Sequence, residues 1–361
     1  MIRSNRSWAR RALLPAASAV VLVAALAAPA AAHPSHSRFA EVDLVSDQQL
    51  PGVLQDPNLV NAWGLALSPT SPLWVANNGT NTATIYAGGV NGAPVTKVPL
   101  TVSVPGGAPT GQAFNDTTAF QVTGSGGMAP ATFLFVSEGG DITGWNRTAT
   151  PTGAVLARHI PGAIYKGLTI VHTKFGPFLI AADFHNGRLD VFDGSFNPVH
   201  LPGVFFHDPR LPRGYAPFNV FALGDALYVS YAKQDADQED EIAGAGFGFV
   251  DKYTNFGLRV QRIASRGPLN APWGMAVAPA AFGDFAGALL VGNFGDGRIS
   301  AYRGDHFVGQ LRTGAGKPIT IDGLWGLLPG TATAGGTGAV WFSAGPDDES
   351  HGLVGEILPA M

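Results

Sequence analysis

Residues 61–69 read Asn-Ala-Trp-Gly-Leu-Ala-Leu-Ser-Pro, and close copies of this stretch return twice later in the chain. Residues 271–279 read Ala-Pro-Trp-Gly-Met-Ala-Val-Ala-Pro, and residues 322–330 read Asp-Gly-Leu-Trp-Gly-Leu-Leu-Pro-Gly. Each copy is followed by a short β-rich run, a polar turn and another β-rich run. A repeat of roughly 50 residues is typical of solenoids, propellers and arrays. The repeat therefore decides the fold class before any single residue is considered.

Weaker copies of the same phrase fill the gaps between the strong ones, at residues 109–114, 165–170 and 216–221. Together they divide the chain into six units whose anchor residues are spaced 47 to 56 positions apart. These anchors are Gly64, Gly111, Gly167, Phe218, Gly274 and Gly326.

Most units contain four short runs of β-forming residues, which is the composition of a propeller blade. We therefore predict an all-β, six-bladed β-propeller with four strands per blade, forming one domain over residues 39–361. The last unit ends after its third strand, whereas residues 39–46 form an alternating strand that belongs to no unit. We expect this N-terminal strand to close the last blade, which removes an open sheet edge.

The N-terminal segment has the pattern of an export signal. Residues 1–32 have a basic start, an Ala-rich apolar stretch and the small residues Ala30-Ala31-Ala32 before His33, and residues 33–38 form a short linker. We expect an exported protein, extracellular or in the periplasm or cell envelope, and no membrane span in the mature chain. Arg10-Arg11 leaves twin-arginine export open beside general secretion.

Composition excludes several functions. Four of the 22 Lys and Arg lie in the signal, so the 26 Asp and Glu leave the mature chain acidic. An acidic surface argues against nucleic acid or an anionic membrane as partner. The chain has no cysteine, which excludes thiol nucleophiles, Cys-ligated zinc and a lipid-modified cysteine. We expect a monomer stabilised by its core and ring closure instead of disulfides.

The unit pattern resembles the NHL repeat, most clearly in residues 181–193 and 291–302. Over its mature length the chain resembles a family of exported six-bladed propellers with no established function. Residues 56–64, 182–188, 293–298, 321–326 and 344–352 carry that resemblance. It implies a fold but no catalytic residues.

Four residues directly before anchor glycines are candidate ligand contacts: Trp63, Lys166, Trp273 and Trp325. In such propellers this position shares one face with the turn between the second and third strands. Aromatic rings beside acids and amides suit a sugar or another small polar ligand. Alternatively, the tryptophans pack where the blades converge, and Lys166 points into solvent instead of receiving an anion.

The turns between second and third strands supply further candidates: Asp183, His185, Asn293 and Asp296. A carboxylate beside an imidazole can perform acid–base chemistry or hold a metal. The alternative is structural, because Asp or Asn followed by a glycine is how such a hairpin caps its own amides.

A second resemblance concerns enzymes. Propeller hydrolases of the gluconolactonase and regucalcin type hold a divalent metal with Asn and Asp residues just before similar glycines. Tryptophan, threonine and lysine take those places here, which argues against that mechanism. Residues that remain candidates for a divalent cation such as Ca are Asn61, Asn270, Asp322, Asp347, Asp348 and Glu349.

We therefore expect a binding module that takes an unidentified small polar ligand, or a secreted or envelope protein, on the face around the central channel. A metal-dependent hydrolase of the lactonase or esterase type is one alternative. A purely structural or cell-surface interaction domain is another.

Overall fold

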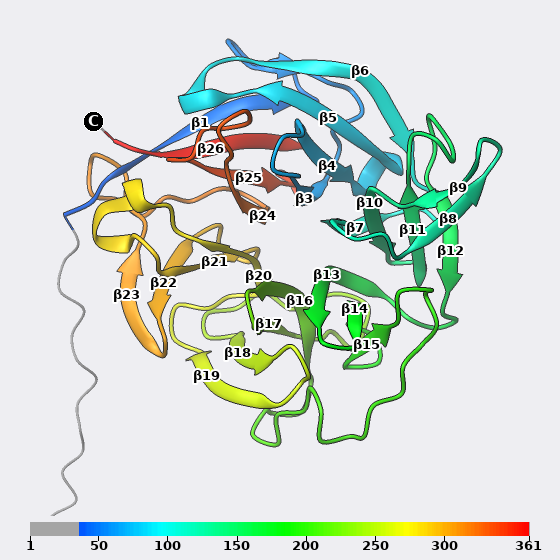
Figure 1. The fold of residues 1–361 in the computed structure, drawn as a ribbon. Helices are drawn as coiled ribbons and strands as arrows, with labels where there is room; N and C mark the ends of the chain where they lie inside the picture. The colour runs from blue at the N-terminus through cyan, green and yellow to red at the C-terminus, as the bar shows by residue number, and fades with distance from the viewer. Residues whose placement is uncertain (1–35, 361) are drawn as a thin grey trace, which may run out of the picture. The chain divides into compact units, whose positions relative to one another are not determined.

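The computed structural model describes residues 36–360, in which six β-sheets surround a common axis (Figure 1). The predicted export signal, residues 1–32, and residues 33–35 of the predicted linker lie outside the described residues. The innermost strands, β3 (Ala62–Ala66), β7 (Pro109–Phe114), β13 (Tyr165–Thr173), β16 (Tyr215–Leu223), β20 (Pro272–Val277) and β24 (Leu324–Pro329), are those that carry the six anchors. Each contacts the next in cyclic order, and β24 contacts β3. The predicted six-bladed propeller is therefore confirmed.

Each blade continues outward by antiparallel pairing of consecutive strands. The second strands are β4 (Leu73–Asn77), β10 (Phe133–Ser137), β14 (Gly176–Asp183), β17 (Ala226–Lys233), β21 (Leu289–Asn293) and β25 (Val340–Ala344). The third are β5 (Thr82–Gly88), β11 (Asp141–Trp145), β15 (Arg188–Phe192), β18 (Phe249–Thr254), β22 (Ile299–Arg303) and β26 (Leu353–Pro359). The fourth are β6 (Val95–Ser103), β12 (Val155–His159), β19 (Arg259–Ser265) and β23 (His306–Gln310).

The anchor glycines mark where neighbouring inner strands approach each other most closely. A Cβ atom on Gly64 would lie 2.5 Å from the Thr110 carbonyl oxygen, and one on Gly111 would lie 2.6 Å from the Leu168 nitrogen. Contacts this short are not tolerated, so these positions require glycine. The fourth blade has Phe218 at its anchor instead, and the next residue, Asn219, donates from Nδ2 to the Trp273 carbonyl oxygen at 2.8 Å.

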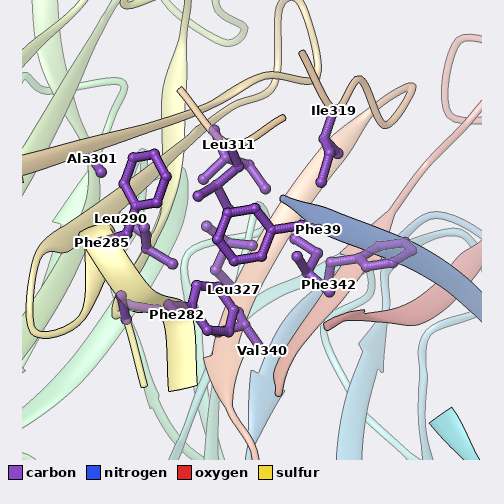
Figure 2. Close-up of a cluster of buried hydrophobic side chains, with 14 of the residues drawn as sticks. Phe39, Phe282, Phe285, Leu290, Ala301, Leu311, Ile319, Leu327, Val340 and Phe342 are labelled. Atoms are coloured by element: carbon purple, nitrogen blue, oxygen red, sulfur yellow. The ribbon is translucent and has the colours of Figure 1, made fainter. Parts of the chain in front are cut away.

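The N-terminal strand closes the ring as predicted. Strand β1 (Phe39–Ser46) pairs antiparallel with β26, and β2 (Leu54–Gln55) pairs parallel with β1. Phe39 is buried in the hydrophobic core between the fifth and sixth blades, against Phe282 and Phe285 (Figure 2). Phe282 and Phe285 lie in the 3-10 segment η3 (Ala280–Phe285). Closure therefore combines a strand ladder with apolar packing.

Two features differ from the expected four strands per blade. The third blade has only β13, β14 and β15, because the segment that follows β15 contains Pro198, Pro202, Pro209 and Pro212, which lack the amide hydrogen that a ladder needs. A separate hairpin, β8 (Gln121–Gly124) with β9 (Gly127–Pro130), lies between β7 and β10. The remaining elements are the 3-10 turns η1 (Asn78–Thr80) and η2 (Val90–Gly92). Among the described residues, no helix has the length and apolarity to cross a membrane.

Candidate functional site

Three of the candidate residues, Trp63, Trp273 and Trp325, meet near the axis of the propeller and are almost fully buried, at 2%, 4% and 0% exposure. The rings of Trp63 and Trp325 stack with centroids 3.6 Å apart, and Trp273 meets both edge-on at 5.9 and 5.8 Å. Phe294 stacks on the other side of Trp325 at 4.0 Å. We call these four rings the tryptophan plug. Their contacts correspond to the packing alternative stated above.

Each indole of the plug donates its N–H to a protein oxygen. Trp63 and Trp325 both donate to Asn61 Oδ1, at 2.9 and 3.1 Å, and Trp273 donates to the Lys166 carbonyl oxygen at 3.0 Å. Asn61 adopts a left-handed backbone conformation, with φ of 48°, which asparagine tolerates better than most residues. One amide oxygen thus connects the first blade to the last.

Lys166 lies beside the plug, and its side chain is 1% exposed. Its Nζ forms ion pairs with Glu138 and, at 2.9 Å, with Asp240, and it lies 5.3 Å from the centre of the Trp63 ring. Burial alone lowers the pKa of this ammonium, but the carboxylates of Glu138 and Asp240 outweigh burial and hold the pKa above its usual value. Lys166 is therefore a charged side chain surrounded by acids.

Four carboxylates gather around Lys166: Glu138, Asp240, Glu241 and Glu349, which we call the carboxylate cap. Burial raises the pKa of Glu241 to about 8, with Lys166 opposing the rise and Glu349 adding to it. Burial also raises the pKa of Glu349, and the charge of Glu138 adds to that rise. One lysine does not neutralise four carboxylates, so the cap has a surplus of negative charge.

Local structure fixes the cap. Asn61 Nδ2 donates to Glu349, and Asn78 Nδ2 donates to Glu138 Oε2 at 3.0 Å. Glu349 ends a left-handed turn in which residues 347–349 have φ values of 53°, 51° and 64°. Such a conformation costs roughly 1–2 kcal/mol per residue, and strain of this kind is concentrated at functional sites.

The candidate residues in the turns between second and third strands mostly form contacts within their own hairpins. Asp183 is buried, accepts the Asn186 backbone N–H at 3.2 Å and lies 3.3 Å from Arg188. Asn293 Nδ2 donates to Asp296 Oδ1 at 3.0 Å. His185 is half-buried, and its Nδ1 has no hydrogen-bond partner within residues 36–360. These contacts correspond to the structural alternative and do not join the carboxylate cap.

The candidate metal ligands do not share one centre. Asn61 Oδ1 accepts the two indole N–H groups, Asn270 Oδ1 accepts the Gly244 N–H at 2.6 Å, and Asp322 Oδ2 accepts the Asp347 N–H at 3.0 Å. Asp347 and Asp348 are exposed in the left-handed turn. Across residues 36–360, no group of three or more His, Cys, Asp or Glu side chains is arranged to hold a metal ion.

Sequence reasoning singled out Lys166 and Glu349 but not their partners Asp240 and Glu241. Both acids lie in the insertion between β17 and β18, which covers the plug end of the fourth blade. The sequence signal that could have identified these two acids is the high density of acidic residues in the segment 235–241, which reads Asp-Ala-Asp-Gln-Glu-Asp-Glu. Periodicity cannot show that this insertion reaches the axis.

No protein-family model matches the chain. It is similar to uncharacterised protein R648 of Acanthamoeba polyphaga mimivirus, with 35% identity over 87% of this chain and 78% of the relative. It is also similar to uncharacterised protein L690 of the same virus, with 33% identity over 87% of this chain and 84% of the relative. A solved structure of a protein of unknown function from Bacteroides thetaiotaomicron VPI-5482 shares the fold, with 12% identity, a TM-score of 0.51 and coverage of 89% of this chain and 76% of that one.

Proposed function

We propose that this chain, which belongs to the family of the mimivirus proteins R648 and L690, is a binding module whose carboxylate cap receives an organic cation. The bound group would be an ammonium or guanidinium of a small polar ligand or of a partner protein's side chain.

The observation that carries this proposal is the convergence of acids from three blades on a single lysine. Glu138 comes from the second blade, Asp240 and Glu241 from the fourth, and Glu349 from the sixth. Like charges held together in a partly desolvated site repel each other, which is why burial and mutual repulsion raise the pKa of Glu241 and of Glu349. A cation bound among these carboxylates relieves the repulsion.

An organic cation suits the cap better than a divalent metal ion. The ammonium of Lys166 already lies among the carboxylates and repels a compact double charge strongly. A guanidinium spreads a single charge over a plane and forms paired hydrogen bonds with a carboxylate. Asp240 is 71% exposed and Glu138 is 29% exposed, so both acids are accessible from outside.

Calorimetric titration with n-butylguanidinium tests the proposal, with n-butanol and butyrate as neutral and anionic analogues. We expect saturable binding of the cation alone, weakened by salt because the attraction is electrostatic. Glu349→Gln should weaken that binding by about tenfold, in line with the loss of one charge-assisted hydrogen bond. Glu239→Gln is the matched control, because Glu239 is an exposed acid of the same insertion.

Equal affinity for butylguanidinium and butanol, or an unchanged affinity in Glu349→Gln, would overturn the proposal. Repeating the titration with a chelator separates it from the lactonase-type alternative. Binding to the cap is expected to be independent of the chelator, whereas a metal-assisted site loses its ligand.

We also propose that the protein is exported, on the basis of the pattern of residues 1–32. N-terminal sequencing of protein recovered outside the cytoplasm should then begin at His33. Recovery of an intact chain from the cytoplasm alone would contradict export.

A further inference from the structure

A cavity of about 400 Å³ lies along the axis of the propeller, on the other side of the tryptophan plug from the carboxylate cap. All six inner strands line it, and Trp273 belongs to its wall. Asn61 and Lys166, which contact the cap, precede the anchors, whereas most residues that line the cavity follow them. Cap and cavity therefore occupy opposite ends of the inner strands.

The wall of this cavity is mostly apolar. Leu65, Leu168, Met275 and Leu327 contribute aliphatic surface from four different blades. Asp116 and His172 are the acidic and imidazole side chains of the lining, 3.1 Å apart, and their exposures of 56% and 59% place them at the mouth. A charged group moved into the deeper part would lose its hydration without finding a partner.

The polar side chain of Gln112 is held inside the wall. Gln112 is 7% exposed, and its Nε2 donates to the carbonyl oxygens of Gly64 and Trp74, both at 2.6 Å. Its Oε1 is buried and does not face the cavity. The deeper wall therefore presents mainly aliphatic surface to a bound molecule.

We infer that this cavity is a second binding site, for an uncharged molecule with an apolar body. A volume of about 400 Å³ falls within the range of small-molecule pockets. The apolar body fills the space between the aliphatic side chains. This site is independent of the cation proposed for the cap, because the tryptophan plug separates the two.

Calorimetry with 1-octanol and octanoate tests this inference, since the two share a chain and differ in charge. We expect saturable binding of 1-octanol and at least tenfold weaker binding of octanoate. From 1-butanol to 1-octanol, affinity should rise about fourfold per methylene, which corresponds to about 0.8 kcal/mol. The butylguanidinium titration should be unaffected by 1-octanol, so failure at one site is distinguishable from failure at the other.

Two variants locate the site. Ala222→Trp adds a large side chain at the cavity wall and should abolish 1-octanol binding, whereas Ala93→Trp adds the same side chain at an exposed position and should not. Absence of saturable 1-octanol binding, equal binding of octanoate, or unchanged binding in Ala222→Trp would overturn the inference.

Discussion

Replacing Glu356 with glutamine should stabilise the protein at alkaline pH and remove much of the pH dependence of its stability. Glu356 lies in β26, between Trp341 of β25 and Val42 of the closing strand β1, and is completely buried. Its Oε2 accepts the Gly92 N–H at 3.0 Å, and its Oε1 has no partner within residues 36–360. Within residues 36–360, the carboxyl group thus lies between the last and first blades without a neutralising cation among its contacts.

Burial raises the pKa of Glu356 from its usual 4.5 to about 8. A folded pKa above the unfolded one means that the folded state holds the proton more tightly. The stabilising contribution of the protonated group is complete below about pH 4.5 and is lost as pH rises through about 8. At about 1.4 kcal/mol per pH unit, the full loss is roughly 4 to 5 kcal/mol. Glutamine does not titrate, so the variant avoids this loss.

Urea unfolding followed by tryptophan fluorescence at about pH 5, 7 and 9 measures this effect as a free energy of unfolding. We expect wild type and Glu356→Gln to differ by less than about 1 kcal/mol at pH 5, and the variant to be more stable by several kcal/mol at pH 9. Glu239→Gln, at an exposed position, is the control and should follow the wild type throughout.

Parallel curves of unfolding free energy against pH for wild type and Glu356→Gln would refute this reasoning. That result would mean that the carboxylate of Glu356 is ionised in the folded protein and is stabilised by a cation or by water between the last and first blades. A lower stability of the variant at every pH would instead show that the second amide hydrogen finds no acceptor there.

Four further outcomes are expected from the same structure. Asn61→Ala leaves two indole N–H groups unpaired and should lower the free energy of unfolding by about 2–4 kcal/mol, with a changed near-ultraviolet circular dichroism spectrum. Lys166→Met leaves buried acids without a counter-charge, so its melting temperature should fall and should recover in part with butylguanidinium. Gly111→Ala places a methyl group against the next inner strand and should cost several kcal/mol in urea unfolding. Deletion of residues 36–46 should leave the ring open and the protein prone to aggregation, with native circular dichroism restored by a peptide of residues 36–50.

The fold was predictable because its signals are local and repeated. Most strands are β-forming runs beside turn residues, which is a local signal in the sequence. Examples are residues 133–137, 141–145, 188–192 and 340–344. The closing strand was predictable by elimination, because one unit lacked a strand and one strand lacked a unit. That the third blade lacks a fourth strand was not predicted. The prolines of residues 198–212 are the physical reason for it and are visible in the sequence.

The candidate site was predictable only in part. The repeat placed Trp63 and its equivalents at one end of the blades, but not their mutual stacking at the axis. Lys166 and Glu138 are 28 residues apart and belong to different blades, and Glu241 lies in an insertion with no counterpart in the other units. Contacts among such residues depend on how far each loop reaches across the ring. That distance is set by tertiary packing and has no periodic signal in the sequence.

Ring closure has a consequence for the order in which the protein is made. Strand β1 leaves the ribosome before any blade exists, and its partner β26 is synthesised after all strands of the first five blades, so Phe39 cannot pair with Pro359 until then. The long segment between the two strands must be folded or closed into a loop before this pairing offsets the entropy of joining its ends. Until then, β1 lacks the antiparallel partner with which it completes the last blade. A nascent chain of this protein therefore remains open until β26 has been made and closes its ring in one late step.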